Sequence, residues 1–186
     1  MQYLNATAKR YVQKQLFSQI KKAKTILGLA GTHPEKYIEV LPPHNQVVLV
    51  DFNPVNETIR RNSLIGEFEL LKIEESNATT VNVVDCDFCR SIINNGDDLL
   101  YIYHRMKRSN KQNQFISYTF SLRGVGLQQT LNWLMSNIPE IRNNLREFES
   151  VDKYFGYRKF VKHLPFSNIY MYRDSGDIMI SGLIKL

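Results

Sequence analysis

The segment "QVVLVDFN", residues 46–53, indicates what kind of sheet this chain forms. Residues 47–50 are four consecutive apolar side chains, three of them valine, and β-branched residues favour strands. A strand that is apolar at every position is covered on both faces, as in a parallel sheet packed between helices. Asp51 would then lie at the carboxyl end of a buried strand, where open parallel sheets bind their ligands.

Further apolar runs alternate with helical patterns along the rest of the chain. This alternation predicts an α/β fold: a mostly parallel, Rossmann-like sheet with helices on both faces and a closing antiparallel β-hairpin around the turn "YRDSGD". The other predicted strands cover residues 25–31, 67–73, 79–85, 114–122, 168–173 and 177–186. Helices are predicted over residues 7–24, 34–41, 53–65, 97–108 and 127–148, the last with a break near Pro139.

The composition indicates a single positively charged domain. The chain has 186 residues and a formal net charge of +6, and no linker divides it, so we expect one domain, 1–186. Residues 1–24 are expected to form a basic amphipathic N-terminal helix. No apolar run approaches the ~20 residues of a membrane span, and two cysteines are too few for a disulfide-built secreted fold. We therefore expect a soluble cytoplasmic protein with no membrane partner.

Lysines and arginines gather in three parts of the sequence. Clustered positive charge attracts phosphate polymers, so a nucleic acid is the expected partner, RNA more than DNA. The alternative is that these charges only keep the protein in solution. A protein partner or a homo-oligomer is also compatible with the sequence. The clusters are Lys9, Arg10, Lys14, Lys21, Lys22 and Lys24; Arg105, Lys107, Arg108 and Lys111; and Arg158, Lys159 and Lys162.

The strand ends resemble those of the class I S-adenosylmethionine-dependent methyltransferases, in element order over residues 25–186. In that family a glycine-bearing loop follows the first strand, an acid ends the second, and a substrate-side motif ends the fourth. Here Asp51 follows Gly31 by 20 residues, the separation expected for a nucleoside cofactor, although Gly28 stands where the family has an acid. The resemblance implies S-adenosylmethionine as cofactor. The residues implied to bind it are Gly28, Leu29, Ala30, Gly31, Asp51, Phe52 and Glu74.

The segment "VVDCDFCRS", residues 83–91, resembles the substrate-side motif of amino-group methyltransferases. Residues 85–88 match an Asp-Pro-Pro-Tyr type motif, and residues 85–91 match the Asp-x-Asp-Pro-x-Gly-Ser pattern of tRNA guanine-N2 dimethyltransferases, both without the prolines. Either alignment implies that Asp85, Asp87 and Phe88 face the amino group of a base. A carboxylate would orient the amine, and the aromatic ring would stack on the base.

The same segment contains both cysteines, Cys86 and Cys89, in a C-x-x-C spacing. Asp85 and Asp87 flank Cys86 and oppose the thiolate that redox chemistry needs, and the clearest helix start comes later, near Asp97. A structural zinc site usually needs four ligands, and there is no second cysteine pair. We therefore expect no metal and treat both thiols as small packing residues.

Three functions are compatible with these sequence features. The first is a methyltransferase that acts on a nucleic acid. The second is the same fold as a catalytically inactive binding module for nucleic acid or protein, which the reduced glycine loop favours. The third is a thiol-dependent protein.

Overall fold

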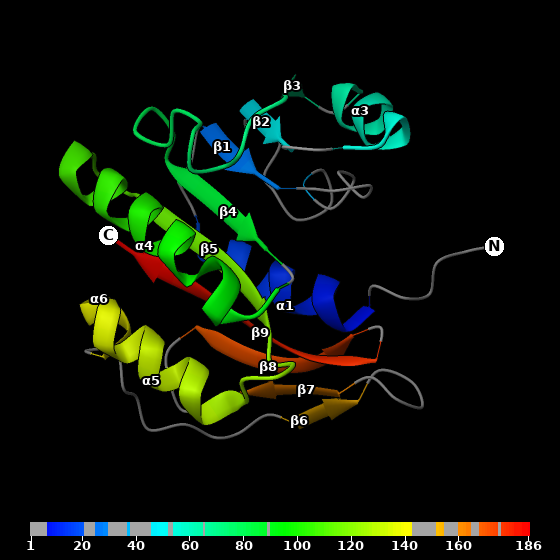
Figure 1. Ribbon diagram of the computed structural model, residues 1–186, viewed down its shortest axis with the longest axis vertical. Helices are drawn as coiled ribbons and strands as arrows, with labels where there is room; N and C mark the ends of the chain where they lie inside the picture. Colours follow the sequence, from blue (N-terminus) through cyan, green and yellow to red (C-terminus); the bar gives the residue numbers. More distant parts are fainter. Residues whose placement is uncertain are drawn as a thin grey trace.

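One β-sheet with both parallel and antiparallel strands forms the centre of the computed structural model (Figure 1). Within the described residues, nine strands join in the order β3-β2-β1-β4-β5-β9-β8-β7-β6. The described residues are 7–20, 25–29, 37, 46–51, 54–64, 66–88, 90–142, 152–154, 160–164, 168–174 and 176–186.

The first five strands are parallel, as the apolar runs predict. β1 (Thr25–Gly28) lies between β2 (Gln46–Val50) and β4 (Val83–Asp87). β3 (Glu67–Glu69) pairs with β2, and β5 (Phe115–Ser121) pairs with β4. β5 is buried at every position, which is the burial expected of a strand with helices or loops over both faces.

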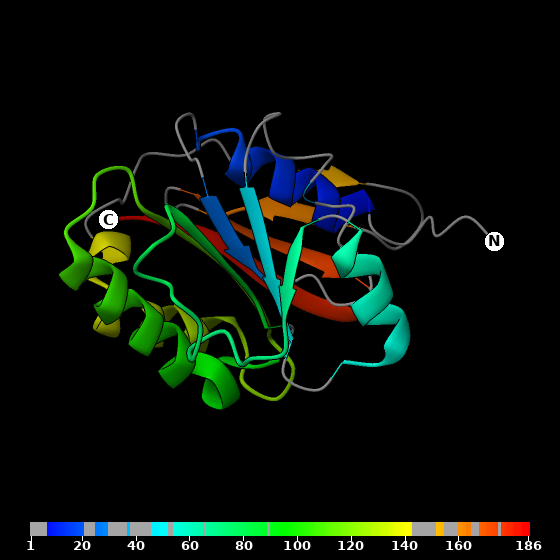
Figure 2. The same ribbon diagram turned by 90° about the horizontal axis from the view of Figure 1, so that it is seen from above.

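Helices cover both faces of this sheet (Figure 2). On one face lie α4 (Ile92–Ser109), α5 (Leu127–Asn137) and the short α6 (Pro139–Arg142), so the predicted break near Pro139 is confirmed. The other face carries α1 (Thr7–Phe17), while α3 (Asn56–Ser63) packs beside the edge strand β3. No helix in the described ranges has the length and apolar content that crossing a bilayer requires.

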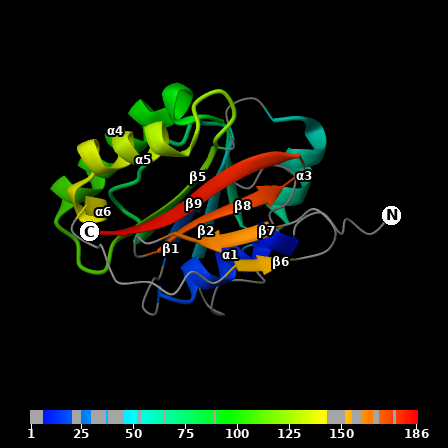
Figure 3. The ribbon, with the colours of Figure 1, turned by 90° about the horizontal axis from the view of Figure 1, so that it is seen from below.

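Antiparallel strands continue the sheet beyond β5 (Figure 3). β9 (Asp177–Lys185) pairs with β5 and with β8 (Ile169–Asp174), and these two strands are the predicted closing hairpin. β7 (Phe160–His163) and β6 (Asp152–Tyr154) extend this antiparallel part further than the sequence predicts. The predicted fold class is therefore confirmed, with a longer antiparallel extension.

Helix α1 packs flat on the antiparallel strands. Ala8, Val12 and Leu16 are spaced one helical turn apart and are fully buried. They belong to one apolar cluster with Val161 in β7 and Tyr172 in β8. The apolar stripe predicted within the N-terminal segment is thus the surface that joins this helix to the sheet.

Helix α4 begins at Ile92, so the predicted start near Asp97 is wrong. The sequence between, "IINNG", contains weak helix formers and resembles a turn. Tertiary packing explains the difference, because a Cβ on Gly96 would lie 2.7 Å from Cζ2 of Trp133 in α5. The glycine lets the two helices approach closely, and this contact outweighs its low helix propensity.

The connection between β3 and β4 contains no helix in the described residues 70–82, and the sequence predicts none between residues 67–73 and 79–85. Ile73, Ala78 and Val81 are buried in the apolar cluster on the α4 side. These side chains cover the sheet in place of a helix. The helix predicted over 34–41 lies outside the described residues except for Tyr37, which is helical.

Candidate active site

The parallel strands bring five of the predicted site residues to one edge of the sheet. Gly28 pairs with Leu49 in β2 and with Asp85 in β4. The amide of Leu29 donates to the carbonyl of Asp85 over 3.2 Å, and the amide of Asp51 donates to the carbonyl of Glu69 over 3.3 Å. The ends of β1, β2 and β4 therefore form one continuous rim.

Asp85 is part of a buried contact at this rim. Its side chain is 1% exposed, and its Oδ2 accepts a hydrogen bond of 2.7 Å from the hydroxyl of Tyr37. The Tyr37 ring reaches Asp85 across Gly28, where a Cβ would overlap the tyrosine hydroxyl. Burial, reinforced by the charge of Asp85, raises the pKa of Tyr37 well above its usual value, so this hydroxyl remains a proton donor near neutral pH.

Asp87 lies two residues further along β4 and is paired with the N-terminal helix. Its Oδ1 and Oδ2 each lie 2.8 Å from Nζ of Lys9 in α1. The carboxylate side chain is 7% exposed and the lysine side chain 19% exposed. α1 therefore lies against the substrate-side motif as well as against the antiparallel strands.

Phe88 lies on the other side of the sheet from these two carboxylates. Its ring stacks on Phe120 of β5, with centroids 5.7 Å apart, and packs against the apolar cluster on the α4 side. The substrate-side motif is thus split at the strand end. Asp85 points towards Tyr37 and Asp87 towards α1, and the aromatic ring points towards α4.

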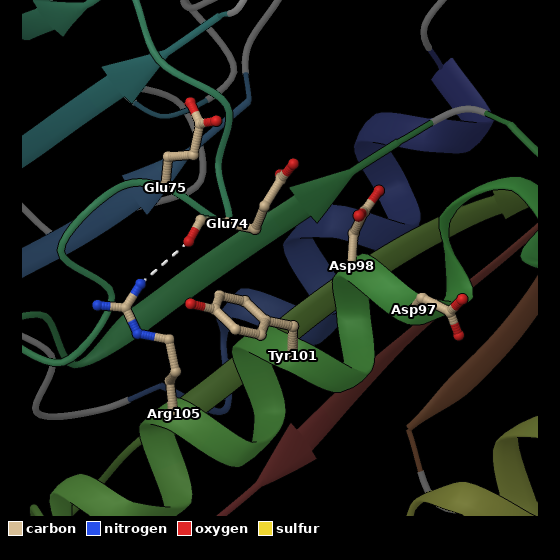
Figure 4. Close-up of a pocket in the computed structure, with 6 residues that line it drawn as sticks. All are labelled: Glu74, Glu75, Asp97, Asp98, Tyr101 and Arg105. Carbon is tan, nitrogen blue, oxygen red and sulfur yellow. Dashed lines mark hydrogen bonds between the residues drawn. The ribbon is translucent and has the colours of Figure 1, made fainter.

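Glu74 lines a cavity of about 650 Å³ between the β3–β4 connection and α4 (Figure 4). Four acidic residues line this cavity. The guanidinium of Arg105 donates to the carbonyl oxygens of Glu74 and Ser76 over 3.0 and 3.1 Å. The cavity therefore has a negative lining suited to an amine or an ammonium group. The residues that line it are Glu74, Glu75, Asp97, Asp98, Tyr101 and Arg105.

Arg105→Ala is expected to lower the free energy of unfolding by about 2 kcal/mol, because two hydrogen bonds from a charged donor are lost. Hydrogen exchange at the amides of Ser76 and Ala78 should become faster, since this guanidinium fixes the connection on α4. Arg108→Ala is the matched control: it removes an exposed arginine of the same helix and should change stability by less than about 0.5 kcal/mol. Equal changes in the two variants would contradict the assigned role.

Cys86 is a buried packing residue. Its thiol is free and fully buried, and burial, followed by the charge of Asp85, raises its pKa well above the usual value. Such a thiol is inert at neutral pH, although α4 does begin shortly after it. Cys89 lies outside the described residues, and no group of three potential ligands suited to a metal ion occurs among the residues that the structure describes.

The predicted residues therefore separate into three groups. Gly28, Leu29, Asp51, Asp85 and Asp87 share the rim, while Phe88 and Glu74 lie on its α4 side. Ala30, Gly31 and Phe52 lie outside the described residues.

Sequence reasoning missed two partners at this rim. Tyr37 stands 48 residues before Asp85, and Lys9 stands 78 residues before Asp87. One signal for Lys9 was present, since a helix with cations and no acid in residues 7–17 needs negative partners elsewhere. No sequence signal identified Tyr37.

Comparison with known proteins finds similarity to this chain in structure and none in sequence. No protein-family model matches the chain, and no curated protein sequence matches it. Among solved structures, the N-methyltransferase NodS from Bradyrhizobium japonicum WM9 aligns with a TM-score of 0.56 at 11% identity, over 95% of this chain and 93% of that chain. Its complex with S-adenosyl-L-homocysteine aligns with a TM-score of 0.53, also at 11% identity, over 95% and 85% of the two chains.

A second methyltransferase aligns equally well. The 1,6-didemethyltoxoflavin-N1-methyltransferase from Burkholderia thailandensis, solved with bound 1,6-didemethyltoxoflavin and S-adenosylhomocysteine, has a TM-score of 0.58 at 8% identity. The alignment covers 98% of this chain and 80% of that one. The chain therefore has the fold of the class I methyltransferases, as its strand order and strand ends predict.

Proposed function

We propose that this chain, which has the class I methyltransferase fold, is an S-adenosylmethionine-dependent methyltransferase whose acceptor is an amino group of a nucleic acid base. One observation supports this most strongly: adjacent parallel strands bring Gly28, Asp51 and Asp87 to a single edge. Ligands of open α/β sheets bind at this edge. The formal net charge of +6 favours a polyanionic acceptor.

The residues present fit the cofactor. Asp51 is half-buried at the end of β2, where a carboxylate can accept hydrogen bonds from ribose hydroxyls. The cavity beside Glu74 offers carboxylates to an adenine amine. Gly28, at the end of β1, would lie beside the methionine part. When bound, S-adenosylmethionine would supply an electrophilic methyl group.

Asp87 would act on the acceptor. A carboxylate at this position can accept a hydrogen bond from the target amine, orient its lone pair, and take up the proton that the methylated nitrogen loses. Phe88 stacks on Phe120 on the α4 side of the sheet, so its part would be to support the strand end that carries Asp87. Asp85 is held by Tyr37 below the rim, so its part would be to support this geometry from within the sheet.

The experiment is to incubate the protein with S-[methyl-³H]adenosylmethionine and, separately, with total RNA, denatured DNA and a protein extract. The proposal expects label in RNA, and nucleoside analysis should place it on an exocyclic amine. Label confined to protein would exclude a nucleic acid acceptor. No transfer by a protein that binds the cofactor would favour the binding-module function.

Asp51→Ala is expected to weaken S-adenosylhomocysteine binding by about 10- to 100-fold, because a charged acceptor of ribose hydrogen bonds is lost. Titration calorimetry measures the change. Glu67→Ala, which removes an exposed carboxylate at the start of β3, should leave the affinity within about twofold. Equal affinities for the Asp51 variant and the unchanged protein would remove Asp51 from the site.

A binding module without catalysis is the second candidate, and the ion pair between Lys9 and Asp87 favours it. A carboxylate held by an ammonium group is a weaker acceptor for a substrate proton. Gly28 stands where the family pattern has an acid, and this also favours a binding module without catalysis. The two candidates differ in methyl incorporation, since both predict nucleic acid binding.

A further inference from the structure

Three arginines stand side by side along the rim that carries Asp87. The amide of Ser121 donates to the carbonyl of Arg90 over 2.9 Å, which places the segment after β4 beside the end of β5. The amide of Leu122 donates to the carbonyl of Ile178 over 2.8 Å, and Ile178 pairs with Arg173 across the β8–β9 hairpin. Arg123 follows Leu122, so a continuous row of backbone contacts joins all three arginines.

All three side chains are exposed, and none forms an ion pair with a carboxylate in the part of the chain that the structure describes. The nearby acids Asp174 and Asp177 pair with each other in register, one step beyond the Arg173 pair. Because side chains alternate along a strand, these acids point to the opposite face of the hairpin. The row is therefore locally cationic.

The turn after β5 helps to expose Arg123. Gly124 and Gly126 have φ values of 77° and 79°, a region that glycine enters without strain. The amides of Val125 and Gly126 both donate to the carbonyl of Leu122, which closes a tight turn. Arg123 stands at the start of this turn and extends into solvent.

We propose that Arg90, Arg123 and Arg173 form a phosphate-binding row that holds the backbone of single-stranded RNA beside Asp87 and Phe88. This rests on the proposed function for the identity of the acceptor, and it adds the surface that docks it. Guanidinium groups bind phosphate with two parallel hydrogen bonds, which makes arginine the preferred residue for such a row.

The dimensions and placement suit a single strand. The row runs from β4 across β5 and β9 to β8, three strand spacings or about 14 Å. Phe88 packs against the apolar cluster on the α4 side of the sheet, and so does Met171 in β8. Arg173 stands two residues after Met171 in the same strand, so it lies on that side too. A backbone held on this row passes over the strand ends, where an unpaired base can reach Asp87, and unpaired bases are characteristic of RNA loops.

The test compares two triple variants with the same charge change. Arg90→Gln, Arg123→Gln and Arg173→Gln remove the row. Arg108→Gln, Lys111→Gln and Lys185→Gln remove three exposed cations near the opposite edge, where Lys185 pairs with Phe115 at the start of β5. Fluorescence anisotropy with a labelled 20-nucleotide single-stranded RNA is measured over a series of salt concentrations. Calorimetry with S-adenosylhomocysteine is run on every variant.

The row variant should bind this RNA about tenfold more weakly or worse. The plot of log K against log salt should become shallower by about 2 units of slope, because three phosphate contacts to a single strand are lost. The control variant should keep the slope of the unchanged protein. Equal losses in the two variants, or no RNA binding by the unchanged protein, would overturn the row, and tighter binding of the matching DNA would overturn the choice of RNA.

The calorimetry separates this inference from the proposed function. S-adenosylhomocysteine binding without RNA binding overturns the row alone. RNA binding that depends on the row, without S-adenosylhomocysteine binding, overturns the methyltransferase and supports the row. Unchanged cofactor binding in the row variant shows that this variant is folded. Each single arginine variant repeats the RNA measurement with a smaller perturbation of the protein.

Discussion

Replacing Gly28 with alanine is expected to destabilise the protein by about 2–4 kcal/mol, the sum of overpacking and a weakened charged hydrogen bond. A Cβ at this position would overlap the Tyr37 hydroxyl and lie 2.5 Å from Cζ of the same ring. The ring must move, and the hydrogen bond to the buried Asp85 must lengthen or break. The melting temperature should fall by about 5–15 °C for a chain of this size.

A double-mutant cycle identifies the cause of this loss. Tyr37→Leu leaves room for the new methyl group, so adding Gly28→Ala to it should cost much less than in the unchanged protein. Additive losses would show that the glycine is needed for another reason, and the contact across β1 would then not explain it. Thermal melts of the two single variants and the double variant measure the coupling.

Replacing Asp87 with alanine is expected to reduce methyl transfer by about 100-fold or more, the usual contribution of a positioned acid–base group. The affinity for S-adenosylhomocysteine should stay within about threefold, because Asp87 serves the acceptor side of the rim in this account. Radiolabel incorporation into RNA measures the rate, and calorimetry measures the affinity.

Lys9→Gln is the matched variant for Asp87→Ala. It breaks the same ion pair of 2.8 Å but keeps the carboxylate. If the pair only anchors α1, both variants lose a similar amount of activity. If Asp87 acts on the acceptor, the lysine variant keeps most of the rate while the alanine variant loses it. Similar losses would therefore contradict the catalytic role.

The sequence predicts the parallel half of the fold because that information is local. The apolar runs over residues 25–31 and 47–50, and the run before Asp85, indicate buried strands. The carboxyl ends of parallel strands must share one edge. The rim follows from those two facts. The start of α4 was mispredicted because Gly96 is a poor helix former until Trp133 packs against it.

The remaining features depend on contacts between distant parts of the chain. Tyr37 reaches Asp85, and Lys9 reaches Asp87, only once α1 and β1 lie against β4. The arginine row likewise exists because three strand ends meet, and Arg90, Arg123 and Arg173 have no common sequence pattern. Edge strands as short as β6 also leave too little periodicity to be identified.

The most direct measurement is titration calorimetry of the unchanged protein with S-adenosylhomocysteine. We predict one site per chain with a dissociation constant between about 1 μM and 1 mM, the range in which enzymes bind their substrates. The Asp51→Ala variant should bind more weakly under the same conditions. A protein that melts cooperatively yet gives no heat of binding at ligand concentrations above that range would contradict the cofactor site, and with it the proposed methyltransferase.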